Sequence, residues 1–214
     1  MSSSSLHVVD HPLVAHRVTI LRDAATDQLT FARMAKEIGT FLAYEAFGDL
    51  AIASTTVDTP VVAGALGATI RQEVVLVPVL RAGLGLTPAL QEALPVTRVC
   101  HVGLRRNEET LEADVYLDGL PADMSGMRVA VLDPMLATGG SLVHVVDMIA
   151  ARGGTDITAI CLVAAVPGVA RFTQAHPNVP VYTAALDDAL NDDGYIVPGL
   201  GDAGDRLFGA PVRP

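Results

Sequence analysis

Short, almost wholly aliphatic runs alternate along this chain with segments in which apolar residues recur at helical spacing. Aliphatic runs of this kind are typical of strands that helices cover on both faces. We expect strands at residues 73–80, 97–104, 128–132, 157–165 and 179–184. We expect helices at residues 27–48, 84–93, 141–152 and 168–175. The alternation predicts an α/β fold with a parallel central sheet flanked by helices.

The segments outside this alternation have patterns of their own. Residues 108–119 alternate polar and apolar side chains, which predicts a protruding β-hairpin flap. Gly153-Gly154 predicts the end of one helix, and Pro167 predicts the start of the next. Near the amino terminus we expect an extended arm that contains His11-Pro12. The last twenty residues, rich in Gly and Asp, predict a segment that closes over a site without adding a core element.

Composition indicates one soluble domain, residues 1–214, because the 214 residues are 50% hydrophobic and only 4% aromatic. No stretch approaches the roughly 20 apolar residues that span a bilayer. Residues 1–5 are expected to be disordered, and the amino terminus lacks the features of a secretory signal, so we expect a cytoplasmic location. Cys100 and Cys161 lie in apolar runs, where we expect buried, unpaired thiols.

The net charge of -10 is unevenly distributed along the chain. Residues 1–107 hold nine basic and nine acidic side chains, whereas residues 108–214 hold five basic and fifteen acidic ones. Such a surface repels phosphates, which argues against a broad interface with nucleic acid. A local basic pocket for a small polyanion remains compatible with this charge.

One stretch combines a buried strand, a single carboxylate, a loop of small residues and a helix, and it runs from Val131 to Ser141. The free N–H groups and the dipole at a helix start favour an anion. Gly139 and Gly140 would let a phosphate approach the main chain, and Asp133 can accept hydrogen bonds from ribose hydroxyls. The alternative is an ordinary turn in which Thr138 or Ser141 caps the helix.

Two other phosphate motifs are excluded. An ATPase loop needs a lysine before its final Ser, and Gly140 stands there. Residues 199–204 match the glycine spacing of a dinucleotide site, but only ten residues follow Gly204, too few for the helix and strand which that site requires.

Basic side chains follow two of the predicted strands. Arg81 comes directly after one strand, and Arg105 and Arg106 end the next. Parallel strands present their carboxyl ends at one edge, where ligands bind, and the guanidinium fork suits a pyrophosphate. The alternatives are that Arg81 pairs with a surface acid and that the arginine pair is only a solvated face.

The motifs VPVLRAGLG, VGLRRNEETLE, VLDPMLATGGS and GYIVPGLGDAGDRLFG, in this order, resemble the uracil phosphoribosyltransferase family. The resemblance extends from HPLVAHRVTILRD to LFG and so covers nearly the whole chain. It implies a type I phosphoribosyltransferase fold, with a small hood made by the amino-terminal arm and residues 185–214. It also implies transfer of ribose 5-phosphate from PRPP to N1 of uracil, which gives UMP and pyrophosphate.

The resemblance also assigns roles to individual residues. Arg81 and Arg106 would contact pyrophosphate, and Asp202 would face the PRPP ribose; with Asp133 these are the expected catalytic residues. The PRPP loop comprises Asp133, Pro134, Met135, Leu136, Ala137, Thr138, Gly139, Gly140 and Ser141. The uracil contacts are Ile196, Gly201, Asp202 and Ala203.

Two positions depart from the family pattern. Pro134 stands where many related enzymes have a second acid, so Mg²⁺ is expected to bind mainly through PRPP, with no metal ligands from the protein. Arg105 replaces an aromatic residue that is frequent in the family, which leaves the geometry of Arg106 open.

Three matters stay open at this stage. The fold is also compatible with a pyrimidine-sensing RNA-binding attenuation regulator, which the acidic charge opposes, and with a phosphoribosyltransferase for another base. The apolar excess and the flap favour a homodimer or a higher homo-oligomer. Whether GTP activates the enzyme, as in some family members, is also open.

Overall fold

The computed structural model describes residues 6–94, 97–106 and 113–210. Its centre is a sheet in the order β1-β11-β10-β8-β4-β6-β7, in which only β7 runs antiparallel to its neighbour. The strands of this path are β1 (Leu6–Val8), β11 (Val181–Asp187), β10 (Asp156–Ala165), β8 (Arg128–Leu132), β4 (Val74–Leu80), β6 (Val102–Arg106) and β7 (Ala113–Asp118). Two short strands join it at the side, β5 (Thr97–Val99) on β4 and β9 (Met135–Leu136) on β10. The predicted α/β fold with a parallel central sheet is confirmed.

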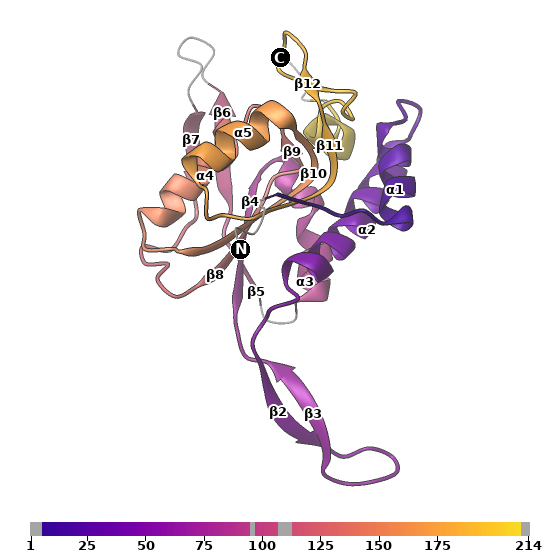
Figure 1. The fold of residues 1–214 in the computed structure, drawn as a ribbon, viewed down its shortest axis with the longest axis vertical. Helices are drawn as coiled ribbons and strands as arrows, with labels where there is room; N and C mark the ends of the chain where they lie inside the picture. The colour runs from indigo at the N-terminus through magenta and orange to yellow at the C-terminus, as the bar shows by residue number, and fades with distance from the viewer. Residues whose placement is uncertain (1–5, 95–96, 107–112, 211–214) are drawn as a thin grey trace.

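Helices cover both faces of the sheet (Figure 1). One face carries α4 (Gly140–Ala150) and α5 (Val166–Ala175). The other carries α1 (Pro12–Arg22), α2 (Gln28–Ala46), α3 (Thr87–Ala93) and α6 (Ala203–Phe208), with a short 3₁₀ turn, η1 (Ala82–Gly85), before α3. Alternate residues of β4 enter the two cores, Leu76 on the α2 side and Val77 on the α4 side. This pleat explains why the strand is aliphatic at nearly every position.

Several local predictions are confirmed. Gly153 has a positive φ of 83° after α4, and the N–H of Gly154 donates to the carbonyl oxygen of Ile149. Pro167 lies in the first turn of α5. Cys100 and Cys161 are both free and buried. A hairpin is present, but it begins before the predicted range of 108–119, since β7 pairs with β6; its tip, residues 107–112, lies outside the described residues, as do residues 1–5.

The expected extended arm at the amino terminus is present but ends earlier than predicted, because α1 begins at Pro12 with His11 as its N-cap. The Nδ1 atom of His11 accepts a hydrogen bond from the N–H of Leu13 at 3.1 Å, and Pro12 occupies the first turn, where its missing N–H costs nothing. Val14, Val18 and Leu21 then give α1 a buried face. Before the helix the chain is extended: β1 pairs in parallel with β11, the N–H of Val9 donates to the carbonyl oxygen of Thr183 at 2.9 Å, and His11 has extended backbone angles.

Two other predictions need correction. The strand expected over residues 97–104 is divided, since β5 pairs with the start of β4 and β6 with its end. Between them the N–H of Cys100 donates to the carbonyl oxygen of Leu76 on β4, and the carbonyl oxygen of His101 accepts from the N–H of Gly119. The last twenty residues do add a core element, because Ala203 and Leu207 of α6 are buried against the α2 side of the sheet.

A hairpin of β2 (Ile52–Val57) and β3 (Ala65–Ile70), absent from the sequence prediction, extends away from the body (Figure 1). It carries exposed apolar side chains, among them Val61 and Leu66, which are 94% and 87% exposed. Among the described residues no helix is both long enough and apolar enough to cross a membrane.

Candidate active site

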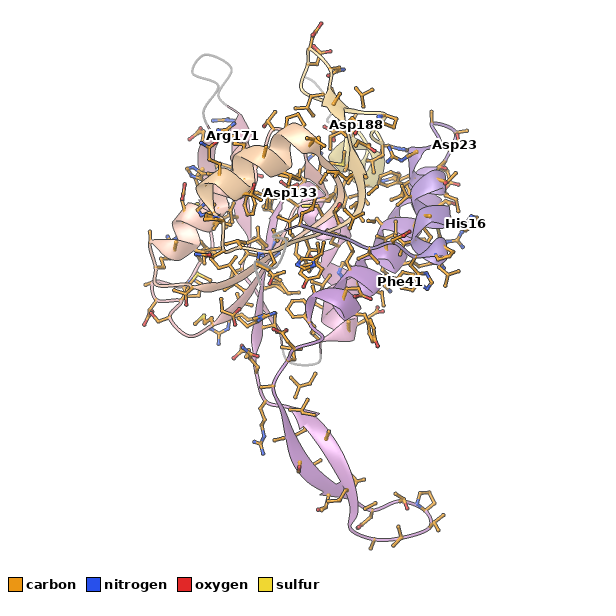
Figure 2. The ribbon with its side chains drawn as sticks, viewed as in Figure 1. His16, Asp23, Phe41, Asp133, Arg171 and Asp188 are labelled. Carbon is orange, nitrogen blue, oxygen red and sulfur yellow. The ribbon has the colours of Figure 1, made fainter. Side chains whose placement is uncertain are left out.

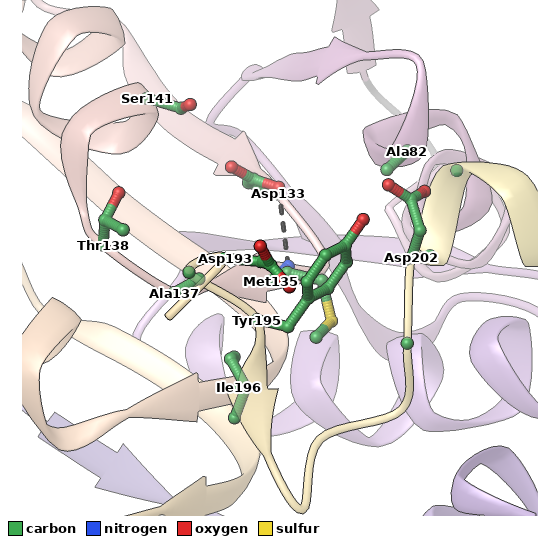
Figure 3. Close-up of a pocket in the computed structure, with 14 residues that line it drawn as sticks. Ala82, Asp133, Met135, Ala137, Thr138, Ser141, Asp193, Tyr195, Ile196 and Asp202 are labelled. Atoms are coloured by element: carbon green, nitrogen blue, oxygen red, sulfur yellow. Dashed lines mark hydrogen bonds between the residues drawn. The ribbon is translucent and has the colours of Figure 1, made fainter. Parts of the chain in front are cut away.

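The carboxyl ends of β4 and β8 open into one pocket of about 390 Å³, as expected for an edge of a parallel sheet. In the view of Figure 3, Asp133 lies between Ser141 of α4 on one side and Ala82 and Asp202 on the other. The pocket is lined by Ala82, Asp133, Met135, Ala137, Thr138, Ser141, Asp193, Gly194, Tyr195, Ile196, Gly201, Asp202, Ala203 and Gly204. The structure thus brings together residues that the sequence assigned to the PRPP loop and to uracil.

The loop between β8 and α4 forms a smaller hollow of about 80 Å³, lined by Asp133 and residues 135–142. Gly139 precedes α4 with a positive φ of 80°, a conformation that favours glycine. Within the described residues no side chain caps α4, so the alternative of a turn capped by Thr138 or Ser141 is not what the structure contains. The free N–H groups at the start of this helix are therefore available to an anion.

The other side of this loop rests on the first turn of α5. A Cβ on Gly168 would overlap the carbonyl oxygens of Leu136 and Ala137, and one on Gly139 would lie 2.8 Å from the carbonyl oxygen of Gly168. Both positions therefore require glycine for a close approach of two main chains. This contact holds the carbonyl side of the loop against α5.

Asp133 follows β8 directly and lies half-buried at the base of the pocket. Its Oδ1 atom accepts a long hydrogen bond of 3.4 Å from the N–H of Met135. Burial raises the pKa of Asp133 to about 7, and the Met135 N–H opposes this only in part. The carboxyl group therefore titrates near neutral pH before any ligand binds.

Arg81 follows β4, and the peptide bond that joins it to Leu80 is cis. Its Nη2 atom donates to Oδ1 of Asp205 on α6 at 3.0 Å, and both side chains are close to half exposed. The structure thus contains the surface ion pair that the sequence left as an alternative. The pair lies beside the pocket, because Ala82 and Gly204, the neighbours of these two residues in the chain, line it.

Arg106 ends β6, which pairs with the last residues of β4 at the same edge of the sheet. Its side chain lies outside the described residues. Arg105 forms an ion pair across the hairpin, since its Nη2 atom donates to Oδ2 of Asp114 on β7 at 2.9 Å.

The residues assigned to uracil lie on a folded carboxyl-terminal segment. Here β12 (Ala189–Leu190) pairs with β13 (Ile196–Val197), and the chain passes through Gly201, with a φ of 77°, into α6. Asp202 caps α6, its Oδ1 atom accepting from the N–H of Asp205 at 2.8 Å. Ile196 and Ala203 line the pocket and are buried.

Two arginines of the hood hold this segment. Arg22 of α1 donates to both carboxylate oxygens of Asp187 at 2.7 and 2.6 Å and to the carbonyl oxygen of Gly199 at 3.0 Å. Arg206 of α6 donates to the carbonyl oxygens of Leu200 and Asp23, among others, at 3.1 and 2.7 Å. Hydrogen bonds therefore join α1 and the residue that follows it to the carboxyl-terminal segment.

Sequence reasoning missed several pocket residues. Asp193, Gly194 and Tyr195 line the pocket but were assigned no role, although Gly194 and Tyr195 begin the motif GYIVPGLGDAGDRLFG. Nothing in the local sequence indicated Gly168, since its partners lie about thirty residues earlier in the chain.

The fold and the site together define a class, the type I phosphoribosyltransferases. Adenine phosphoribosyltransferase from Trypanosoma brucei has the same fold, with a TM-score of 0.55 over 92% of this chain and 88% of that chain at 14% identity. The AQ2163 protein from Aquifex aeolicus, 35% identical, gives a TM-score of 0.89 over 97% of this chain and 100% of that chain.

Sequence comparison then specifies the family. The profile of the uracil phosphoribosyltransferase family matches residues 8–210. The uracil phosphoribosyltransferase of Pediococcus pentosaceus is 48% identical over 94% of this chain and 97% of its own length. That of Beutenbergia cavernae is 50% identical, with coverages of 95% and 98%. The chain belongs to the uracil phosphoribosyltransferase family, as its motifs predicted.

Proposed function

We propose that this protein transfers ribose 5-phosphate from PRPP to N1 of uracil, forming UMP and pyrophosphate. One observation carries the proposal: the phosphate-binding loop, Asp133 and the segment from Ile196 to Ala203 line a single pocket. Family membership supports the same reaction.

The reaction builds positive charge on the ribose ring and negative charge on the departing pyrophosphate. The N–H groups of residues 137–141 would bind the 5-phosphate, and Asp133 would accept from the ribose hydroxyls. Arg81 and Arg106 would neutralise the pyrophosphate, and Asp202 would face the ribose. Gly201 and Ala203 would read the planar uracil ring through main-chain groups, which places N1 for in-line attack.

Magnesium is proposed to enter with PRPP. The described residues contain no cluster of three His, Cys, Asp or Glu side chains arranged to hold a metal ion. The pocket carboxylates, Asp133, Asp193 and Asp202, come from separate segments. This arrangement fits an ion that takes most of its ligands from phosphates and water, as Mg²⁺ does, and that helps to neutralise the leaving group.

Base selectivity tests the proposal. The protein is incubated with PRPP, Mg²⁺ and uracil, cytosine, orotate or hypoxanthine in turn, and pyrophosphate release is measured. We expect release with uracil alone. Release with another base in preference to uracil, or with none of the four, would overturn the assignment.

We also propose a homodimer or higher homo-oligomer. The exposed apolar side chains of the β2–β3 hairpin support this proposal, and light scattering would test it.

GTP activation and a cytoplasmic location stay predictions. Adding GTP to the same assay tests the first, and imaging of the tagged protein in cells tests the second.

A further inference from the structure

Arg171, on the second turn of α5, lies against the start of α4 (Figure 2). A Cβ on Gly140 would lie 3.5 Å from its Nη1 atom and 3.7 Å from its Nη2 atom. Because Gly140 has no side chain, this guanidinium group lies directly beside the main chain of the first turn of α4. The same turn of α4 begins at the hollow which the loop forms.

Arg171 differs from the other described arginines of residues 108–214, which are Arg128, Arg152 and Arg206. Arg128 and Arg152 pair with carboxylates, and Arg206 donates to main-chain carbonyl oxygens. Within the described part of the chain Arg171 is exposed and has neither an ion pair nor a hydrogen bond. This is notable where fifteen acidic side chains accompany only five basic ones.

The electrostatics of this placement are unfavourable as they stand. The aligned peptide dipoles leave about half a positive charge at the start of α4, and a cation beside it is repelled. A doubly charged phosphate in the hollow would reverse the sign of that interaction. A guanidinium group binds phosphate well because it offers paired, charge-assisted donors.

We propose that Arg171 binds the 5-phosphate of PRPP from the α5 side of the loop, together with the N–H groups of α4. The inference rests on the proposed function and adds one residue to it. Arg171 is exposed and no hydrogen bond or ion pair from the described residues holds it, so a change of side-chain rotamer would bring the guanidinium group toward the bound anion.

The contact would act on binding and not on the chemical step. The 5-phosphate keeps its charge throughout the reaction, so Arg171 would stabilise the bound substrate and the transition state alike. Loss of such a contact raises the KM for the substrate and leaves kcat unchanged. A purely solvated surface arginine would alter neither constant.

The test compares Arg171→Gln with Arg98→Gln, which removes the same charge from an exposed pair at the start of β5, the opposite end of the sheet. For Arg171→Gln we expect the KM for PRPP and the Kd for ribose 5-phosphate to rise about fivefold to tenfold. The value of kcat and the KM for uracil should stay within about twofold of native. Arg171→Lys should restore part of the affinity, and Arg98→Gln should behave as native.

A second measurement needs no variant. Titration of the native protein with inorganic phosphate should shift the NMR signal of the Arg171 Nε–H, assigned by its loss in Arg171→Gln. An unchanged signal, or equal ribose 5-phosphate affinities for the Arg171→Gln and Arg98→Gln proteins, would overturn the inference while uracil turnover still stood. If the native protein turned over no base, the proposed function would fall, and the phosphate titration would still decide whether Arg171 meets an anion.

Discussion

Arg22 and Asp187, 165 positions apart in the chain, form a bidentate ion pair with N–O distances of 2.7 and 2.6 Å. Asp187 also accepts from the N–H of Gly199 at 2.9 Å, so the pair connects α1 to the segment that carries the proposed uracil site. Burial acts to raise the pKa of Asp187, but the Arg22 guanidinium and the Gly199 N–H together hold that pKa below its ordinary value.

Asp187→Asn should lower both stability and uracil affinity, because it leaves Arg22 with no charged partner at a mostly buried position. We expect a loss of about 2–3 kcal/mol, less than for a fully buried pair, since about a quarter of the Arg22 side chain is exposed. Chemical denaturation and the KM for uracil measure the two effects.

Glu37→Gln, which breaks the more exposed pair with Arg17, is the control and should cost under about 1 kcal/mol. Because the pKa of Asp187 is lowered in the folded protein, its ionised carboxylate stabilises the fold above about pH 4. This stabilisation is lost as the solution is acidified. Equal losses in the two variants would contradict the role of the Arg22 pair.

Asp133→Asn should stabilise the ligand-free protein in a pH-dependent way. The pKa of Asp133 is raised to about 7, so the folded chain keeps a proton which the unfolded chain releases near pH 4. The stability of the native protein therefore falls as pH rises from about 4 to about 7 and then levels off. In thermal unfolding, the Tm of Asp133→Asn relative to that of the native protein should rise over this pH range.

Asp192→Asn is the control, because it removes a carboxyl group that is exposed; its stability should follow the native pH dependence. In the assay Asp133→Asn should lower kcat more than it weakens uracil binding, because the carboxylate is proposed to act on the ribose. An unchanged kcat would refute that role.

Gly168→Ala should displace the PRPP loop. Its Cβ would overlap two carbonyl oxygens of the loop, and such overpacking costs about 1–3 kcal/mol. We expect the KM for PRPP to rise about tenfold, corresponding to about 1.4 kcal/mol, with a lower Tm. Gly48→Ala is the control, since a Cβ there meets nothing closer than 3.8 Å. A native KM for PRPP in Gly168→Ala would show that the loop tolerates the shift.

Arg81→Gln should lower turnover about a hundredfold, because the proposed contact with pyrophosphate strengthens as the leaving group departs. Its Tm should hardly change, since the ion pair with Asp205 is close to half exposed. Pyrophosphate release and thermal unfolding measure the two effects, with Arg98→Gln again as the control. A large fall in Tm with normal turnover would make Arg81 a structural residue.

Much of the architecture was predictable from local patterns. The strand β8 has the predicted bounds, and α4 and β10 begin one residue before the predicted positions. The predicted loop of small residues does separate β8 from α4, and Gly139 precedes the helix. These features depend on residues within one or two turns of each other, so hydrophobic period and glycine placement suffice to predict them.

The sequence by itself determined the layered α/β fold, the loop at Asp133 and the order of the motifs that place the chain in its family. Only the tertiary structure decided that α6 enters the core, that Arg22 pairs with Asp187, and that Gly168 and Arg171 lie against the loop. The physical reason is distance along the chain. Periodicity reports which face of an element is buried, whereas the partner across that face comes from a remote segment that only packing brings near.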